Sequence, residues 1–392
     1  MLPLACAALM YSNGAVAQIS QTIHPFVSVG YTYDDNLLRL PDQAVGVEQR
    51  SDRMTQALAG VQIDRPVGRQ NFTATAKVTR VTFDHYDQLD YNGKDFKAEW
   101  AWRVGNYFDG TLGATYEQTL TPFTDYHSDE RNLRTQRREY VSGGWRFHPR
   151  WRVRTGAERS RYTYELSVQR GNNRETTLAE LGVDYLAPSG DRIGLVARQF
   201  EGSYRNARNV NGVLLQDDYK QDELKANILW TPTGVTQVQV LAGYARRRHD
   251  AFTARDSSGA NGRITVAWAP TGKLKFTGAA WREFAAVESS VVNNSLNSGG
   301  SLAATWSISA KVQANASVRR ETREFERLAG STLASDDLSD RIRGATVGLT
   351  YAPIRSVQLS LSGFADRRSG NPIIGTSDYK AKGVAANVTL QF

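Results

Sequence analysis

The chain has little of several features that would mark other classes of protein. Its 392 residues include a single cysteine, Cys6, and only three methionines. No apolar run reaches the roughly 20 residues that a membrane-spanning helix needs. These absences exclude a disulfide-built fold and a helical membrane protein. They do not exclude a transmembrane β-barrel, because barrel strands are apolar on one side only.

The sequence also lacks the arrangements that catalysis and metal binding use. Its five histidines are scattered, at positions 24, 85, 127, 148 and 249, and their spacing fits no metal motif. There is neither a nucleophile elbow nor a phosphate-binding loop, and Ser128 beside His127 is too little for a hydrolase site. We therefore expect no enzymatic activity, no metal and no cofactor.

The first 17 residues have the features of an incomplete secretory signal peptide. An apolar segment is followed by Ala15-x-Ala17, a small-residue cleavage pattern, but no lysine or arginine precedes it. We expect a truncated or misassigned start. A merely apolar terminus is one alternative, and a lipoprotein signal at Cys6 is another, which Pro3 disfavours. Cleavage after Ala17 would leave residues 18–392 as one barrel domain without cysteine, which suits an oxidising periplasm.

Tight turns recur along the chain at intervals of about 40 residues. Proline presets φ at the first turn position and glycine accepts positive φ, so such segments join neighbouring strands directly. The predicted turns are Arg65–Gly68, Val104–Asn106, His148–Arg150, Ala187–Gly190, Thr231–Gly234, Ala269–Gly272, Ser307–Ser309 and Ala352–Ile354.

Alternating apolar and polar residues flank these turns and predict strands. With a first strand at Phe26–Tyr33 and a last at Tyr379–Phe392, the turns imply about 18 strands, or 16 if two are miscounted. The longer polar segments between hairpins are 34–52, 120–135, 203–218, 248–261, 288–299 and 325–340. Short turns at one end and long loops at the other predict an all-β fold, a transmembrane antiparallel up-and-down barrel. A soluble solenoid is the alternative.

The last strand has the pattern of a barrel's closing strand. Val384, Ala386, Val388, Leu390 and Phe392 share one face, and the opposite face is polar or small. We interpret Val388, Leu390 and the terminal Phe392 as a signal for the outer-membrane barrel-assembly machinery. The strand should close the barrel by pairing antiparallel with the first one.

Aromatic residues stand shortly before the predicted turns, each on the apolar face. Rings at one fixed depth are typical of the belt at a membrane interface, here against outer-membrane lipid and lipopolysaccharide. The predicted belt consists of Trp102, Trp145, Tyr185, Trp230, Trp268, Trp306 and Tyr351.

Basic residues dominate the opposite, lumen-facing side, and the chain has a formal net charge of +8. A ring of like charge near the periplasmic mouth would concentrate an anionic solute. The alternative is that lumen charges pair across the wall and only support its shape. The basic charge is spread over the chain, so we expect no nucleic-acid partner. The candidates near the turns are Arg103, Arg146, Arg152, Arg154, Arg192, Lys273, Lys275 and Lys311.

One stretch resembles a known family. Asp34-Asp35-Asn36-Leu37-Leu38-Arg39-Leu40-Pro41-Asp42 is similar to the "DDNLfRLPD" opening of EpsL-type exopolysaccharide outer-membrane proteins, which are exosortase-associated β-barrel porins. A second similar stretch comprises Phe123–Tyr126 and Arg131–Thr135. The resemblance implies export of a secreted polysaccharide, with periplasmic export components as partners. It supplies no binding residues. Asp34, Asp35, Asn36 and Arg39 could bind a cation or sugar hydroxyls, but such residues more often cap a strand and begin a loop.

The sequence therefore predicts a protein of the bacterial outer membrane that conducts an extracellular polysaccharide, anionic or polar. A general or small-solute porin is the second hypothesis. A structural or adhesive barrel closed by its loops is the third. Acidic residues in the loops would meet lipopolysaccharide through divalent cations, or they are merely solvated.

Overall fold

The structure is a computed structural model that describes residues 22–42, 49–210, 213–215, 217–250, 253–287, 294–325, 338–374 and 376–392. The expected signal peptide and Cys6 lie outside these residues. In the part of the chain described, no helix is long and apolar enough to cross a membrane.

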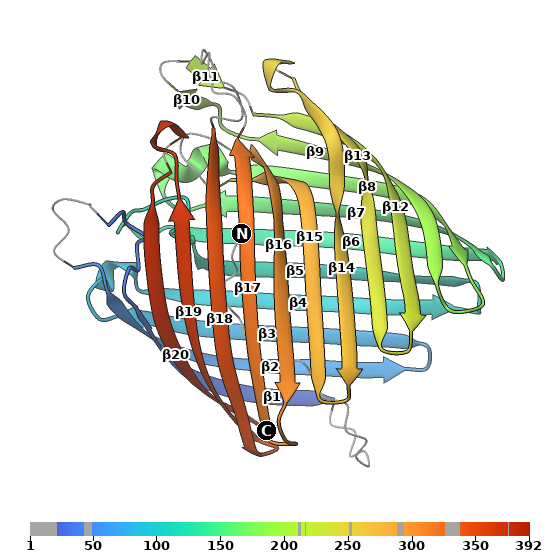
Figure 1. The fold of residues 1–392 in the computed structure, drawn as a ribbon, viewed down its shortest axis with the longest axis horizontal. Coiled ribbons are helices and arrows are strands. Elements are labelled where there is room, and N and C mark those ends of the chain that lie inside the picture. The colour runs from blue at the N-terminus through green and yellow to red at the C-terminus, as the bar shows by residue number, and fades with distance from the viewer. Residues whose placement is uncertain are drawn as a thin grey trace.

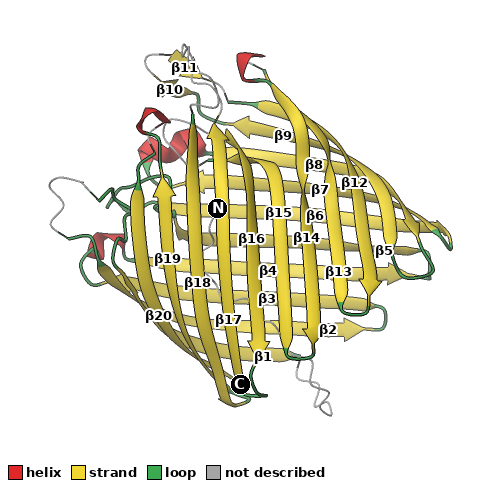
Figure 2. Cartoon of the chain, in the orientation of Figure 1, coloured by secondary structure: helices red, strands yellow, loops and turns green. Residues whose placement is uncertain are grey.

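Eighteen antiparallel strands form one closed sheet, a barrel whose strands are joined in chain order (Figures 1 and 2). Two further short strands, β10 and β11, make a hairpin in one long loop. The barrel strands are β1 (Ile23–Asp34), β2 (Asp52–Val67), β3 (Gln70–Phe83), β4 (Tyr91–Val104), β5 (Phe108–Leu120), β6 (Leu133–His148), β7 (Trp151–Tyr164), β8 (Arg174–Leu186), β9 (Arg192–Tyr204), β12 (Tyr219–Thr233), β13 (Thr236–His249), β14 (Ser257–Thr271), β15 (Leu274–Ala286), β16 (Asn294–Ser307), β17 (Val312–Phe325), β18 (Ser339–Ile354), β19 (Val357–Ser369) and β20 (Tyr379–Gln391).

Among the described residues, four short 3-10 helices and the β10–β11 hairpin lie in the connections at the long-loop end. The helices are η1 (Asp87–Leu89), η2 (Ser167–Asn172), η3 (Thr253–Arg255) and η5 (Pro372–Ile374), and the hairpin strands are β10 (Arg208–Val210) and β11 (Val213–Leu215). Short turns join the strands at the opposite end (Figure 2). By the usual orientation of such barrels, the long loops face outward from the cell and the turns face the periplasm.

The barrel closes between β1 and β20, as the sequence predicts. These strands pair antiparallel, with Phe26 opposite Gln391 and Asp34 opposite Gly383. The terminal Phe392 donates its backbone N–H to the carbonyl oxygen of Pro25 at 2.9 Å. The first strand is longer than predicted, because it begins at Ile23 and ends at Asp34.

The outward face of the barrel is apolar. Val29, Leu181, Leu224 and Val347 are each 57–61% exposed, on strands in different parts of the wall. A soluble protein rarely leaves an apolar surface of this extent in water. The alternation of the strands therefore points one face to lipid and the other to the lumen.

Some predicted boundaries are wrong. The turn placed at Ala352–Ile354 lies two residues later, at Arg355 and Ser356, because β18 continues to Ile354. The predicted loops 248–261 and 288–299 contain the first residues of β14 and β16. Asn294 and Asn297 of β16 are buried polar residues, and polar residues that face a lumen look like loop residues in the sequence.

The compact apolar clusters lie at the long-loop end rather than in the wall. Leu37 and Leu38 from the loop after β1 pack with Val81, Phe83 and Leu89. A second cluster comprises Val287, Phe325, Leu338 and Ile374. The loops are thus folded onto the barrel mouth.

All seven predicted belt aromatics lie in the last residues of a strand at the turn end. Five of them are 42–51% exposed, and Trp102 and Tyr185 are half-buried. Several contact an aromatic ring on the neighbouring strand: Trp145 with Phe108, Trp268 with Phe276 and Tyr185 with Trp151, at centroid distances of 6.2, 5.4 and 5.3 Å. This position fits a membrane-interface belt, which stays a prediction.

Candidate functional site

The connection between β5 and β6, residues 121–132, crosses the barrel interior, and we call it the crossing loop. β5 and β6 belong to the rear wall of the barrel in Figure 1, whereas β17 to β19 form the front wall. Asp125 of the crossing loop nevertheless contacts Arg323 of β17 and Arg368 of β19. Because these two arginines project from the inner face of the wall, the loop spans the lumen from one wall to the other.

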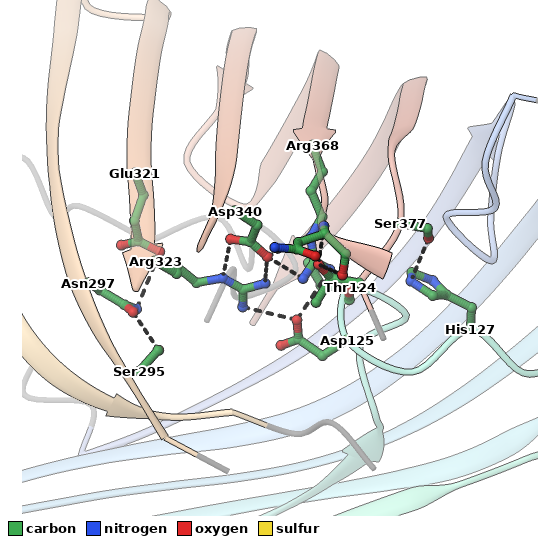
Figure 3. Close-up of polar contacts among 12 residues, drawn as sticks. Thr124, Asp125, His127, Ser295, Asn297, Glu321, Arg323, Asp340, Arg368 and Ser377 are labelled. Carbon is green, nitrogen blue, oxygen red and sulfur yellow. Dashed lines mark hydrogen bonds and ion pairs between the residues drawn. The ribbon is translucent and has the colours of Figure 1, made fainter. Parts of the chain in front are cut away.

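Four charged residues join the crossing loop to the front wall, and we call them the ionic cluster: Asp125, Arg323, Asp340 and Arg368 (Figure 3). Asp125 Oδ1 lies 2.9 Å from Arg323 Nη1 and 3.4 Å from Arg368 Nη1. Asp340 of β18 lies between the two arginines, with Arg323 Nε at 2.9 Å and Arg368 Nε at 2.9 Å. Arg368 also donates to the backbone carbonyl of Thr124.

The charges of the ionic cluster balance. Two guanidinium groups face two carboxylates, and all four side chains are mostly or fully shielded from solvent. Burial opposes ionisation of Asp125, but Arg323 and Arg368 outweigh it and lower the pKa of this carboxyl to about 2. Asp125 is therefore charged at neutral pH, and the loop is held by its ion pairs with Arg323 and Arg368 and by the hydrogen bond that Arg368 donates to Thr124.

His127 fixes a second point of the crossing loop. Its Nδ1 lies 2.9 Å from the carbonyl oxygen of Leu38, so Nδ1 carries the proton and donates it. Ser377 then donates its hydroxyl to Nε2 at 3.3 Å. Burial lowers the pKa of His127, which keeps the ring neutral, as this pair of hydrogen bonds requires.

Many lumen-facing basic residues are paired with acids on the same strand or on strands nearby in the wall. Arg152 lies 2.5 Å from Asp109, and Arg154 lies 3.5 Å from Asp184. The same holds for basic residues nearer the loop end, through the pairs Arg138–Glu158 at 2.7 Å, Arg198–Glu223 at 3.0 Å and Lys225–Glu223 at 2.9 Å. This part of the wall is braced by alternating charges.

The other predicted lumen cations are not paired in this way. Arg103, Arg146, Arg192 and Lys275 lie on the lumen side of their strands near the turns. Within the described ranges, none of these four has an ion pair. Lys273 and Lys311 lie in turns, outside the strands, so strand alternation assigns them no face. An unpaired basic zone therefore remains at the periplasmic end of the lumen.

The family-like motif after β1 forms a tight loop anchor. Arg39, whose φ is 58°, donates from Nη1 to both carboxylate oxygens of Asp34, at 2.9 and 2.8 Å. Asn36 donates its side-chain amide to the carbonyl oxygens of Leu40 and Lys380. Asp35 accepts the backbone N–H of Lys382 at 2.6 Å. The motif therefore ties the loop after β1 to the start of β20, beside the barrel seam.

Most of the ionic cluster is not evident from the sequence. In the sequence, Asp125 stands out only as part of the family-like stretch Phe123–Tyr126, and nothing there marks Arg323, Asp340 or Arg368. The lumen-facing direction of Arg323 and Arg368 could have been predicted from the sequence, because each occupies a polar-face position in its alternating strand. That these positions face a loop from the far wall could not be read from the sequence.

The closed barrel, the apolar outer face and the inward loop define the chain as an outer-membrane β-barrel of porin type. A family model described as "Putative beta-barrel porin 2" matches residues 232–392. No curated protein sequence matches the chain.

Three solved bacterial structures have a similar fold. The outer-membrane protein OpdK from Pseudomonas aeruginosa is 11% identical with a TM-score of 0.50, over 94% of this chain and 98% of that one. OccK5 from the same organism is 12% identical with a TM-score of 0.48, over 94% and 98% of the two chains. A BenF-like porin from Pseudomonas fluorescens is 9% identical with a TM-score of 0.48, over 95% and 99%. The likeness to OpdK supports the fold.

Proposed function

We propose that the protein is a passive outer-membrane channel for small polar solutes, with the crossing loop as its constriction. The observation that carries this proposal is the contact of Asp125 with Arg323 and Arg368 across the lumen. A loop tied to the far wall divides the interior and limits the size of what passes. An extended polymer would require the loop to move, whereas a small solute would not.

The charges of the lumen favour a moderate preference for anions. The ionic cluster contributes no net charge, and the paired residues of the wall largely cancel. The unpaired Arg103, Arg146, Arg192 and Lys275 remain near the periplasmic end, where a confined positive potential raises the local concentration of anions. OpdK has been solved with vanillate, a small carboxylate, so a barrel of similar fold accepts a solute of this size.

Conductance of the purified barrel in planar bilayers tests the proposal. We expect a permanent conductance, a reversal potential in a salt gradient that reports anion preference, and block by small organic anions. A variant in which Arg103, Arg146, Arg192 and Lys275 are changed to Gln should lose the preference without losing conductance. Cation preference of the unmodified barrel would contradict the charge argument. Absence of conductance would favour a closed structural or adhesive barrel.

Export of an extracellular polysaccharide is the second candidate. Its support is the resemblance of the Asp34–Asp42 motif and of the stretch around Asp125 to exopolysaccharide outer-membrane proteins. Deleting the gene and measuring surface against periplasmic polysaccharide separates the two functions. Retention of polymer in the periplasm would favour export, and normal secretion would remove this candidate. In the bilayer, an export channel should also respond to added polymer, which a narrow porin should ignore.

A further inference from the structure

The outward face of β17 to β20 carries a row of basic residues at the long-loop end. Arg320, Arg343, Arg367 and Lys380 stand directly opposite one another on four successive strands, by the pairings Arg320–Arg343, Arg343–Arg367 and Arg367–Lys380. All four are exposed. Neighbouring strands are about 4.8 Å apart, so the row is about 14 Å long. We call it the basic row.

The basic row points to lipid and not to the lumen. Arg320 is on the same face of β17 as Val318, and Arg343 is on the same face of β18 as Val347. These valines are 54% and 61% exposed on the apolar surface. Arg343 lies about 26 Å along its strand from Tyr351 of the aromatic belt, and strand tilt reduces this to roughly 20 Å of height. The basic row is therefore at the outer edge of an apolar band about 25 Å tall.

Like charges directly opposite on neighbouring strands repel and destabilise a sheet. Elsewhere on the outer face, several basic residues have acidic partners: Arg80 with Asp90, Arg159 with Glu175, Lys220 with Glu201 and Arg248 with Asp222, at 3.1, 2.7, 3.9 and 2.6 Å. In the basic row, Lys380 pairs with Asp42 at 2.9 Å. The three arginines have no ion pair with any residue that the structure describes, and Asp42, which pairs with Lys380, also interacts with the charge of Arg367. Among the described residues, the row therefore carries more positive charge than its neighbours neutralise.

We propose that the basic row binds the phosphorylated headgroup of an outer-leaflet glycolipid of the lipid A type. Such a lipid brings phosphate groups to the height of the row and acyl chains to the apolar surface below it. Guanidinium groups match phosphate with paired hydrogen bonds, and the long side chains reach the headgroup while their stems lie on the apolar wall. Arg341 and Lys382, which neighbour the row on the same face, extend it.

Native mass spectrometry of the purified barrel titrated with lipid A tests the proposal. The variant R320Q/R343Q/R367Q/K380Q should bind lipid A at least about tenfold more weakly than the unmodified barrel. The matched control R80Q/R159Q/K220Q/R248Q removes the same number of outward charges from the paired region and should bind like the unmodified barrel. Heat-modified mobility on gels checks that each variant is folded. If the four-residue variant does not fold, R343Q alone serves, with R343K restoring binding.

Two further binding measurements test whether the phosphate groups and the acyl chains of the ligand are both needed. Dephosphorylated lipid A should bind more weakly to the unmodified barrel and equally to both variants. Inorganic phosphate should not compete at concentrations near those of lipid A, because it lacks the acyl chains. Equal binding of lipid A by the basic-row variant and the control would overturn the proposal. So would equal binding of the phosphorylated and dephosphorylated lipids by the unmodified barrel.

Discussion

Replacing Asp125 by Asn is the sharpest test of the constriction. Asn has the shape of Asp but no charge, so Asp125→Asn removes the charged acceptor that Arg323 and Arg368 contact at 2.9 and 3.4 Å. Both arginines keep Asp340 as a partner, so neither becomes an isolated buried charge. The barrel wall should therefore stay intact, and the effect should fall on attachment of the loop.

The magnitude follows from hydrogen bonds to charged groups, which contribute about 1.5–3 kcal/mol. Since Asn still offers a carbonyl oxygen, we expect the attachment to weaken by about 2 kcal/mol, which raises the detached population roughly 30-fold. Single-channel recording should then show more frequent transitions to a larger conductance. The contacts of His127 with Leu38 and Ser377, in the neighbouring loops, should make these openings brief.

Asp129→Asn is the matched control. Asp129 lies in the same loop, is exposed, and accepts a weak hydrogen bond from Gln88 at 3.4 Å. It should leave the recordings unchanged. If Asp125→Asn and Asp129→Asn both behave like the unmodified channel, the ionic cluster does not hold a constriction and the reasoning fails.

Three further predictions concern pH, the loop anchor and the C-terminus. The pKa of Asp125 is lowered to about 2, so the stabilising effect of its charge is fully present above its ordinary pKa of about 3.9 and is lost as pH falls through about 2. Single-channel recordings should therefore be constant from about pH 7 to about pH 5 and show larger openings below about pH 3. The Asp125→Asn variant should lack this response. Arg39→Ala leaves the buried Asp34 without its ion pair and should lower barrel stability by about 1–3 kcal/mol, seen as unfolding on gels at lower temperature; unchanged melting would show that the motif has no anchoring role. Removing Phe392 deletes the backbone hydrogen bond to Pro25 and the terminal aromatic ring, so it should reduce the amount of assembled barrel while the assembled fraction conducts normally; undiminished membrane insertion would contradict this.

The motif Asp34–Asp42 shows how far a resemblance extends. In the sequence it could be a binding loop or a strand cap. In the structure its side chains are directed to one another and to the backbone of β20, through Asp34, Asp35, Asn36 and Arg39. The motif thus anchors the loop after β1 to β20 at the barrel seam, and it does not by itself indicate what the channel conducts.

The predicted cationic lumen shows a similar limit. Arg152 and Arg154 look free in the sequence because their partners, Asp109 and Asp184, lie on other strands. Strand register brings each pair together, and register is set by all the turns and pairings at once. Local pattern alone could predict which face a charge occupies, but not whether that charge is neutralised.

The barrel itself could be predicted from local sequence pattern. Alternation with period two assigns each strand a lipid face and a lumen face, and the number of predicted turns gives the number of strands. Alternation and turn formation both depend only on residues that are neighbours in the chain. The path of the crossing loop could not be predicted in this way, because Asp125 and Arg368 are brought together by closure of the whole sheet. The same closure placed Arg320, Arg343, Arg367 and Lys380 in one row, which no single strand reveals.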